Sequence, residues 1–365
     1  MFNLSPSRTI ALSSIYHKLF SSFSLLKQSP VVFIDVDGVL KLGKKPIPNA
    51  KKGIELLRRY NIPLQIVTND GGNTEISRAK VYSSILNLST PFTYKDITLS
   101  HSPMQSVLSN FSKKDTDKIP LIVGRGNVSS LMSYYNVKRY ITVKEYASIF
   151  YKMLPRNIIR HLIPISQKMT EKISKRLSMK IDPDKPLGIN GIFQISDVLR
   201  WEVPIQLICD LMISKDGYPG SVKGEEAPFS VEYHTAFDDF EYKDQFVLTR
   251  YCGGACIKSA VHLFKMMNGY PFPYTVYGKP SKKVFEYAKN KIKKYYPNIK
   301  ASNYYMIGDN PCIDIKGANE NGITSILVRT GVFNGKNNDE QYPAKVVLKD
   351  FYSAVKYILS KEKII

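Results

Sequence analysis

Acidic residues form two short groups that lie far apart in the sequence. Asp35 and Asp37 fall at the end of the apolar run 31–36 and are followed by a glycine. Asp309 and Asp314 follow a second apolar run near the end of the chain. Carboxylates can act as nucleophiles, as general acids or bases, and as ligands of Mg²⁺. The two groups can therefore build one reactive site if the fold brings them together.

Two further polar groups accompany these acids. Thr68 and Asn69 end the apolar run 64–68, and Lys279 stands between a glycine and a proline ahead of the second acidic group. Hydroxyl, amide and ammonium groups are suited to hold the oxygens of an anion. Each piece alone is common in loops and helix caps. All four groups in this order, each at the edge of an expected strand or loop, are much harder to obtain by chance.

The elements that must position these groups are buried strands. Short apolar runs predict strands at residues 31–36, 64–68, 304–309, 325–328 and 345–348. Helices are expected between them, for example at 50–60 and 74–86. This alternation predicts an α/β protein with a Rossmann-like, doubly wound parallel sheet. Ligands bind beyond the carboxyl ends of the strands in such sheets, so the polar groups should meet at one edge.

The middle of the chain has a different pattern, with shorter strands such as 121–123 and more polar linkers. We interpret it as an inserted α/β cap domain. The expected division is core 30–114, cap 115–270 and core 271–365.

The N-terminal residues 1–29 are expected to be a mitochondrial targeting segment. No acidic residue precedes Asp35, and the first 30 residues hold eight serines and three basic residues. Apolar residues there fall on one helical stripe, as in transit peptides. The alternative is an N-terminal helix that docks on the domain.

Composition excludes several classes of protein. The 43% hydrophobic content suffices for a large core, so disorder is not the main state. No apolar run reaches the roughly 18 residues of a membrane-spanning helix, and four cysteines do not make a disulfide framework. The net charge of +21 suits an anionic substrate, an anionic lipid surface or nucleic acid, or is a general basic background. Because no basic-aromatic motif occurs, specific nucleic-acid binding is not expected.

The four polar groups resemble the motifs of the haloacid dehalogenase (HAD) superfamily. Its motifs are Asp-x-Asp after a strand, Ser or Thr after a strand, a Lys, and an Asp pair separated by four residues. The resemblance implies that Asp35 is the nucleophile and forms an aspartyl-phosphate. Asp37 would be the general acid and base, and Thr68 and Lys279 would hold the phosphoryl oxygens. An acid two residues after the nucleophile follows the pattern of the phosphatases rather than the dehalogenases.

The resemblance also implies a cofactor, Mg²⁺. Its expected ligands are Asp35, the backbone carbonyl of Asp37 and Asp309, with Asp314 completing the acidic shell. Asn69, Arg125 and Arg250 are candidate substrate-binding residues.

The Thr-Asn start of the second motif and the inserted domain resemble HAD subclass IIA. Further stretches, among them 99–104 and 200–202, are similar to the mitochondrial HAD-like hydrolases named after the cat eye syndrome critical region. The stretch 250–256 departs from that branch, because a Gln is missing and two cysteines stand there. Substrate recognition by the cap therefore differs from the branch pattern.

The expected function is that of a Mg²⁺-dependent phosphatase of the mitochondrial matrix that acts on a small-molecule phosphate ester. The branch resemblance suggests a link to glycerophospholipid metabolism. The alternative is a HAD-fold accessory subunit of a large mitochondrial assembly that uses its basic surface to bind a membrane or partner proteins.

Overall fold

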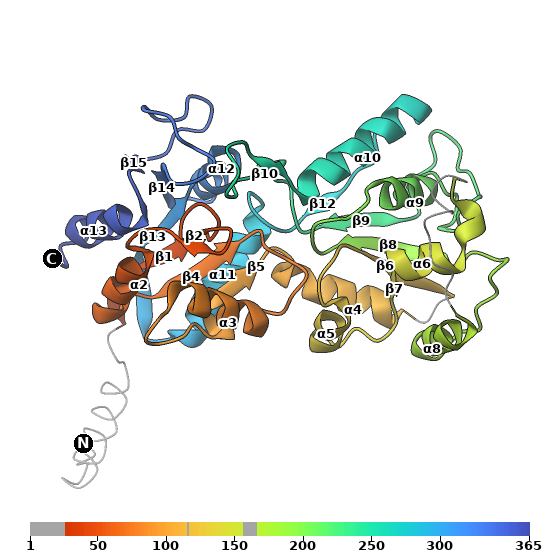
Figure 1. Ribbon diagram of the computed structural model, residues 1–365, viewed down its shortest axis with the longest axis horizontal. Coiled ribbons are helices and arrows are strands. Elements are labelled where there is room, and N and C mark those ends of the chain that lie inside the picture. Colours follow the sequence, from red (N-terminus) through yellow and green to blue (C-terminus); the bar gives the residue numbers. More distant parts are fainter. Residues whose placement is uncertain (1–25, 115–116, 156–165) are drawn as a thin grey trace, which may run out of the picture.

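The computed structural model describes residues 26–114, 117–155 and 166–365 of the chain. Figure 1 shows two lobes along the long axis, with the core at one end and the cap at the other. The expected targeting segment 1–29 lies outside the described residues except for its last few, and Lys27–Ser29 already belong to the first core strand. No helix in the described ranges is long and apolar enough to cross a membrane.

The core lobe contains, in the described residues, a six-stranded parallel sheet in the order β15-β14-β13-β1-β4-β5. Its strands are β1 (Lys27–Ile34), β4 (Leu64–Thr68), β5 (Ile97–Leu99), β13 (Ile299–Gly308), β14 (Thr324–Val328) and β15 (Val346–Leu348). After β1 the chain adds β4 and then β5 on one side of this strand. After the cap it adds β13, β14 and β15 on the other side of β1. Strand β1 is therefore the point where the strand order reverses, which is where open α/β sheets bind ligands.

Helices cover both faces of the core sheet. Successive residues of β1 point to opposite faces, so Val32 and Ile34 pack on one side and Val31 and Phe33 on the other. The first face is covered by α2 (Ala50–Arg59), α3 (Glu75–Leu86) and α13 (Phe351–Lys361). The second is covered by α11 (Lys282–Tyr295) and α12 (Lys316–Glu320). This two-sided burial explains why the strands read as continuous apolar runs.

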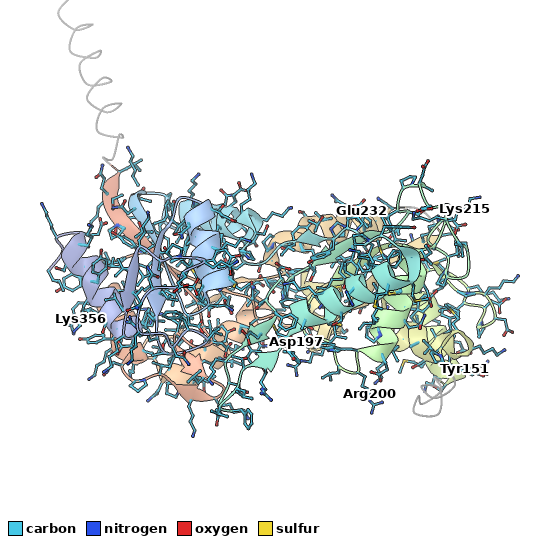
Figure 2. The ribbon with its side chains drawn as sticks, turned by 90° about the horizontal axis from the view of Figure 1, so that it is seen from above. Tyr151, Asp197, Arg200, Lys215, Glu232 and Lys356 are labelled. Atoms are coloured by element: carbon cyan, nitrogen blue, oxygen red, sulfur yellow. The ribbon has the colours of Figure 1, made fainter. Side chains whose placement is uncertain are left out.

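The cap lobe has a second parallel sheet of five strands among the described residues, in the order β12-β9-β8-β6-β7. Its strands are β6 (Lys118–Val123), β7 (Ile141–Thr142), β8 (Gly188–Gln194), β9 (Glu232–Thr235) and β12 (Thr275–Val276). Its helices are α4 (Gln105–Lys113), α5 (Val128–Tyr134), α6 (Val143–Ile149), α8 (Gln167–Leu177), α9 (Glu202–Met212) and α10 (Gly253–Asn268). Figure 2 shows Lys356 on the core, Tyr151 and Lys215 on the distant part of the cap, and Asp197 near the junction.

The described residues also form two short hairpins, namely β2 (Lys41–Leu42) with β3 (Lys45–Pro46) and β10 (Glu241–Tyr242) with β11 (Arg250–Tyr251). Short helical turns are η1 (Tyr94–Asp96), η2 (Ser102–Met104), η3 (Tyr151–Met153) and η4 (Pro311–Ile315).

The expected α/β class with a parallel core sheet and an α/β cap is confirmed. The cap limits 115–270 stay a prediction. In the structure, α4 packs on the cap sheet before residue 115, and β12 joins that sheet after residue 270.

Candidate active site

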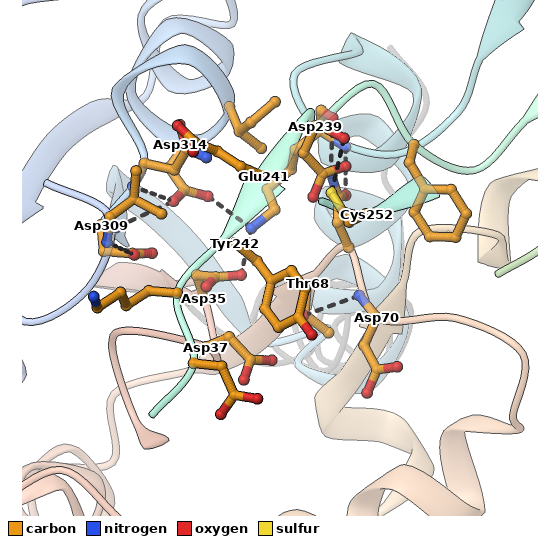
Figure 3. Close-up of a pocket in the computed structure, with 18 of the residues that line it drawn as sticks. Asp35, Asp37, Thr68, Asp70, Asp239, Glu241, Tyr242, Cys252, Asp309 and Asp314 are labelled. Atoms are coloured by element: carbon orange, nitrogen blue, oxygen red, sulfur yellow. Dashed lines mark hydrogen bonds and ion pairs between the residues drawn. The ribbon is translucent and has the colours of Figure 1, made fainter. Parts of the chain in front are cut away.

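The carboxyl ends of three neighbouring core strands bring the predicted polar groups together. Asp35 follows β1, Thr68 ends β4, and Asp309 follows β13. All three residues are buried. In Figure 3 they lie around one pocket with Asp314 close to Asp309. Parallel pairing of β1 with both β4 and β13 places these ends side by side.

Lys279 connects the two acidic groups. Its Nζ lies 2.5 Å from Oδ1 of Asp35 and 2.6 Å from Oδ1 of Asp314, and all three side chains are buried. The other oxygen of Asp314 accepts hydrogen bonds of 3.1 Å from the backbone N–H groups of Asp309 and Asn310. Asp314 therefore fixes both Lys279 and the loop that carries Asp309.

Asp309 is held in a tight space between two loops. Its Oδ2 accepts a 2.7 Å hydrogen bond from the backbone N–H of Val332. Gly38 and Gly331 pack directly on its carboxylate, because a Cβ atom at Gly38 would come 2.2 Å from Oδ2 and one at Gly331 would come 1.9 Å from it. Gly38 also has a φ of +84°, which favours glycine. The glycine after the Asp-x-Asp pair thus allows strands β1 and β13 to present their acids together.

Asp37 lies at the edge of the site and is half-buried. Its Oδ1 forms an ion pair with Nζ of Lys41, the first residue of β2. Burial raises the pKa of the Asp37 carboxyl, and the charge of Lys41 only partly offsets this shift. The protonated form of Asp37 is therefore more accessible than that of an ordinary aspartate.

Asn69 joins three parts of the protein. Its Oδ1 accepts a 2.9 Å hydrogen bond from the N–H of Lys279, and its Nδ2 donates to the carbonyl of Lys279 at 2.9 Å. The same Nδ2 also donates to Oδ1 of Asp239, a cap residue, at 3.0 Å. Asn69 therefore positions the backbone of Lys279 and links it to the cap. Thr68 accepts a 3.2 Å bond from the N–H of Asp70.

The electrostatics of the buried groups are dominated by negative charge. Burial raises the pKa of Asp35 to about 7, although Lys279 opposes this shift. Burial would lower the pKa of Lys279, but Asp314 and Asp35 raise it above its ordinary value. The pKa of Asp309 is raised well above its usual range by burial and by the charges of Asp314 and Asp35. One ammonium group thus faces three buried carboxylates.

This excess of negative charge fits a divalent cation. One oxygen each of Asp35, Asp309 and Asp314 can be chosen so that all three lie within 4.8 Å of one another. Carboxylate oxygens are hard ligands of the kind that Mg²⁺ prefers. The carboxylate of Asp37 is not in this group and is paired with Lys41.

The pocket has a volume of about 300 Å³ and is lined by both lobes. Core residues at its base are Asp35, Asp37, Thr68, Lys279, Asp309 and Asp314, and the expected substrate-binding residues Asn69 and Arg125 also line it. Arg125 is largely exposed, and its Nη2 lies 3.2 Å from Oδ2 of Asp197.

Arg250 is not among the residues that line the pocket. Its Nε donates to the carbonyl of Thr249, and its guanidinium lies over the ring of Phe246. The structure thus gives Arg250 no place in this pocket.

The sequence interpretation missed several residues that line the pocket. From the core these are Lys41, Asp70 and Arg78, and from the cap they are Asp197, Phe237, Asp239, Glu241, Tyr242 and Cys252. In Figure 3, Tyr242 and Asp239 face the core acids from the cap side. Lys41 and Asp70 are close in sequence to predicted motifs, which is a usable signal. The cap residues carry no such signal, because their place depends on how the second lobe folds over the first.

Comparison with known proteins agrees with this site. Residues 32–138 match the family model described as haloacid dehalogenase-like hydrolase, and residues 276–354 match the one described as HAD-hydrolase-like. The two matched segments contain the first and second motifs and the third and fourth motifs, respectively.

Two curated relatives cover most of the chain. A cardiolipin synthase (CMP-forming)/mitochondrial hydrolase fusion protein of Schizosaccharomyces pombe is 30% identical over 336 residues, which is 90% of this chain and 53% of the relative. The chain thus spans about half the length of that relative. A mitochondrial hydrolase of Saccharomyces cerevisiae is 27% identical over 351 residues, which is 90% of this chain and 94% of the relative.

A solved structure supports the same fold. The glycerol phosphate phosphatase of Mycobacterium tuberculosis in complex with magnesium has a TM-score of 0.53 and 16% identity, covering 89% of this chain and 76% of that one. The solved structure supports the fold alone, and the two family matches identify the chain as a hydrolase of the haloacid dehalogenase superfamily.

Proposed function

We propose that the chain is a Mg²⁺-dependent phosphatase that hydrolyses a phosphomonoester through an aspartyl-phosphate. The observation that carries this proposal is the position of Asp35. It is buried at the carboxyl end of the central strand, 2.5 Å from Lys279, at the base of a pocket that both lobes line. A nucleophile at this edge meets the substrate where the fold binds ligands.

In the first step, a carboxylate oxygen of Asp35 attacks phosphorus, and the bond from phosphorus to the ester oxygen breaks. Asp37 donates its proton to the departing oxygen. In the second step, Asp37 takes a proton from a water molecule that attacks phosphorus, and the aspartyl-phosphate is cleaved to inorganic phosphate and free Asp35. The raised pKa of Asp37 suits the first of these roles.

The remaining core residues hold the phosphoryl group. Thr68 and Lys279 would contact its oxygens, and Asn69 keeps the Lys279 backbone in place through two hydrogen bonds. Asp35, Asp309 and the carbonyl of Asp37 would hold Mg²⁺, with Asp314 orienting Lys279 and the Asp309 loop. The bound cation would neutralise phosphoryl charge and keep Asp35 ionised.

The cap would exclude water and select the leaving group. Tyr242 and Asp239 line the pocket opposite the core acids, and Arg125 offers a cation at the pocket wall. Arg125 and Tyr242 are therefore the substrate-binding residues that we propose for the cap. Arg250 is not among them, because it does not line the pocket.

We further propose that the protein acts in the mitochondrial matrix on a glycerophospholipid phosphate and belongs to subclass IIA. Support comes from the names of the two relatives, both called mitochondrial hydrolases, one of which is joined to a cardiolipin synthase. A reporter fused to residues 1–30 should enter mitochondria. A reporter that stays in the cytosol would contradict the targeting part of this proposal.

A phosphate-release screen tests the activity. Purified protein is incubated with sugar, nucleotide and lipid phosphates, with Mg²⁺ or with EDTA. We expect turnover of at least one ester class in Mg²⁺ and none in EDTA. Equal turnover in Mg²⁺ and in EDTA would refute the metal requirement. If no phosphate is released from any ester, the proposal that the protein is a phosphatase is refuted.

A further inference from the structure

The hairpin of the cap that carries β10 and β11, here called the cap hairpin (residues 240–251), exposes an unusual amount of apolar surface. Val247 and Leu248 at its tip are 78% and 63% exposed, and Tyr251 is 69% exposed. Phe240 and Phe246 are about half exposed. Five large apolar side chains are thus exposed within twelve consecutive residues, and the rings of Phe240 and Tyr251 lie 5.2 Å apart. Isolated exposed apolar residues are normal on a protein surface, but a concentration of this kind points to a binding site.

The other side of the same hairpin belongs to the active site. Its residues Glu241, Tyr242, Lys243 and Asp244 line the pocket above Asp35. None of the five exposed apolar residues of the hairpin lines the pocket. Whatever binds the apolar side lies next to the pocket.

Basic side chains surround the apolar tip. Within the hairpin, Nζ of Lys243 donates to the carbonyls of Phe246 and Val247 at 3.0 and 2.6 Å, and Arg250 lies 4.5 Å from the centre of the Phe246 ring. The β2–β3 hairpin touches the cap hairpin at Gly43, where an added Cβ would come 2.6 Å from side-chain atoms of Asp244 and Gln245.

The neighbouring β2–β3 hairpin adds two more cations beside the tip. Lys44 in its turn and Lys45 at the start of β3 are exposed. The whole chain carries a net charge of +21, which attracts the protein as a whole to anionic surfaces. An apolar tip flanked by Lys and Arg is the composition of segments that bind the interface of an anionic membrane.

We propose that the cap hairpin inserts its apolar tip into the surface of an anionic lipid bilayer, with Lys44 and Lys45 contacting the headgroups. A protein partner of standard size would need about 800 Å² on each side, more than a twelve-residue hairpin offers alone. Docking of this kind places the pocket entrance at the bilayer. The consequence for substrate choice, namely a phosphomonoester carried by a membrane lipid, rests on the proposed phosphatase function.

Vesicle flotation tests the docking without any catalytic readout. Full-length protein is mixed with vesicles of phosphatidylcholine alone or with added phosphatidylglycerol. We expect flotation with the anionic vesicles. The double variant Val247→Asp/Leu248→Asp should bind them at least about tenfold more weakly, because two apolar insertions are replaced by charges. Lys44→Ser/Lys45→Ser should weaken the preference for phosphatidylglycerol.

The chain offers a matched control in Met266→Asp/Met267→Asp. These two residues are 72% and 82% exposed at the C-terminal end of α10, so the pair removes at least as much apolar exposure elsewhere on the cap. This control should float like the wild type. If the wild type floats with neither vesicle, or if the hairpin and control variants behave alike, the proposal is overturned.

Hydrolysis of the soluble ester p-nitrophenyl phosphate separates this proposal from the phosphatase proposal. The hairpin variant should keep the wild-type rate on this substrate, since neither Val247 nor Leu248 lines the pocket. If flotation depends on the hairpin but the wild type hydrolyses no ester, the membrane-docking proposal stands and the phosphatase proposal is refuted. If the hairpin variant instead changes the oligomeric state in light scattering and leaves flotation unchanged, a second copy covers the patch and membrane docking is wrong.

Discussion

Among the residues that the structure describes, Lys279 is the one cation within hydrogen-bond reach of Asp35 and Asp314, and it is buried as they are. A buried charge that loses its partner is costly, because desolvation is no longer offset by attraction. The ion pairs of this residue therefore serve both the architecture of the site and its chemistry. The same cannot be said of the many exposed lysines, whose pairs contribute little.

Replacing Lys279 by Met should abolish phosphatase activity and lower the free energy of unfolding by about 3–5 kcal/mol in EDTA. Urea denaturation followed by circular dichroism measures the second effect. Lys282→Met is the matched control, since Lys282 is exposed and lies 3.7 Å from Glu286 on the same helix. That control should change stability by less than about 0.5 kcal/mol. Equal effects of the two variants would contradict the assigned role of Lys279.

The three buried carboxylates predict stabilisation by metal. Mg²⁺ binds the folded state and not the unfolded chain, so it should raise the Tm of the wild type in a concentration-dependent way. Asp309→Asn removes one negative charge from the group and should abolish most of this rise. Differential scanning fluorimetry with and without Mg²⁺ checks it. A rise of equal size in the variant would place the metal elsewhere.

At the scale of elements, the site depends on how closely strand ends and loops approach one another. Gly38, in the turn after β1, is in contact with the Asp309 carboxylate that follows β13. A side chain at this position would push the two strand ends apart. The motif glycine is thus a requirement of packing between elements as well as of the local turn.

Gly38→Ala should therefore lose at least about a hundredfold in kcat/KM, since misplacing a reacting group by about 1 Å has such an effect. Gly220→Ala is the control for backbone strain, because Gly220 has a φ of +96° and open space around it. Both variants should lose of the order of 1 kcal/mol of stability from the left-handed backbone, but only Gly38→Ala should lose activity. Steady-state kinetics on both proteins decides the point.

Sequence reasoning located the strands of the core well, because strands buried on both faces are continuous apolar runs. The structure extends the run 304–309 back to residue 299, where its polar residues pair with the start of β1. It also adds β5, a three-residue edge strand that is too short to be recognised from its pattern. Asp35 and Asp309 could be placed at strand ends from the sequence, because each directly follows such an apolar run.

Contacts between lobes were much less accessible from the sequence. Tyr242 and Asp239 line the site only because the cap folds over the core, and no local pattern encodes that placement. Arg250 illustrates the same limit, because it is a candidate substrate-binding residue by its charge, whereas in the structure it lies over the ring of Phe246 and does not line the pocket.

At the scale of the whole molecule, two lobes with separate cores line the polar pocket that contains Asp35 at their junction. Such an arrangement suits an enzyme that closes over a small substrate. The net charge of +21 also suits the alternative role as an accessory subunit of a mitochondrial assembly that binds a membrane or partner proteins. A cellular experiment distinguishes the two roles.

Asp37→Asn should keep the fold, because Asp37 is only half-buried at the sheet edge, and should disable proton transfer. Loss of a general acid typically lowers the rate by about 10²–10⁴. Cells in which this variant replaces the wild type should behave like cells that lack the protein. If the variant has near-zero activity and yet restores growth fully, the protein acts as a scaffold and not through catalysis.

The central claim is that Asp35 is the nucleophile of a phosphatase, and the most direct measurement is phosphate release by purified Asp35→Asn in Mg²⁺. The substitution is nearly isosteric and removes the attacking charge and a metal ligand. We expect no turnover above background on any ester that the wild type hydrolyses, with an unchanged circular dichroism spectrum. Substantial turnover by the folded variant would contradict the account.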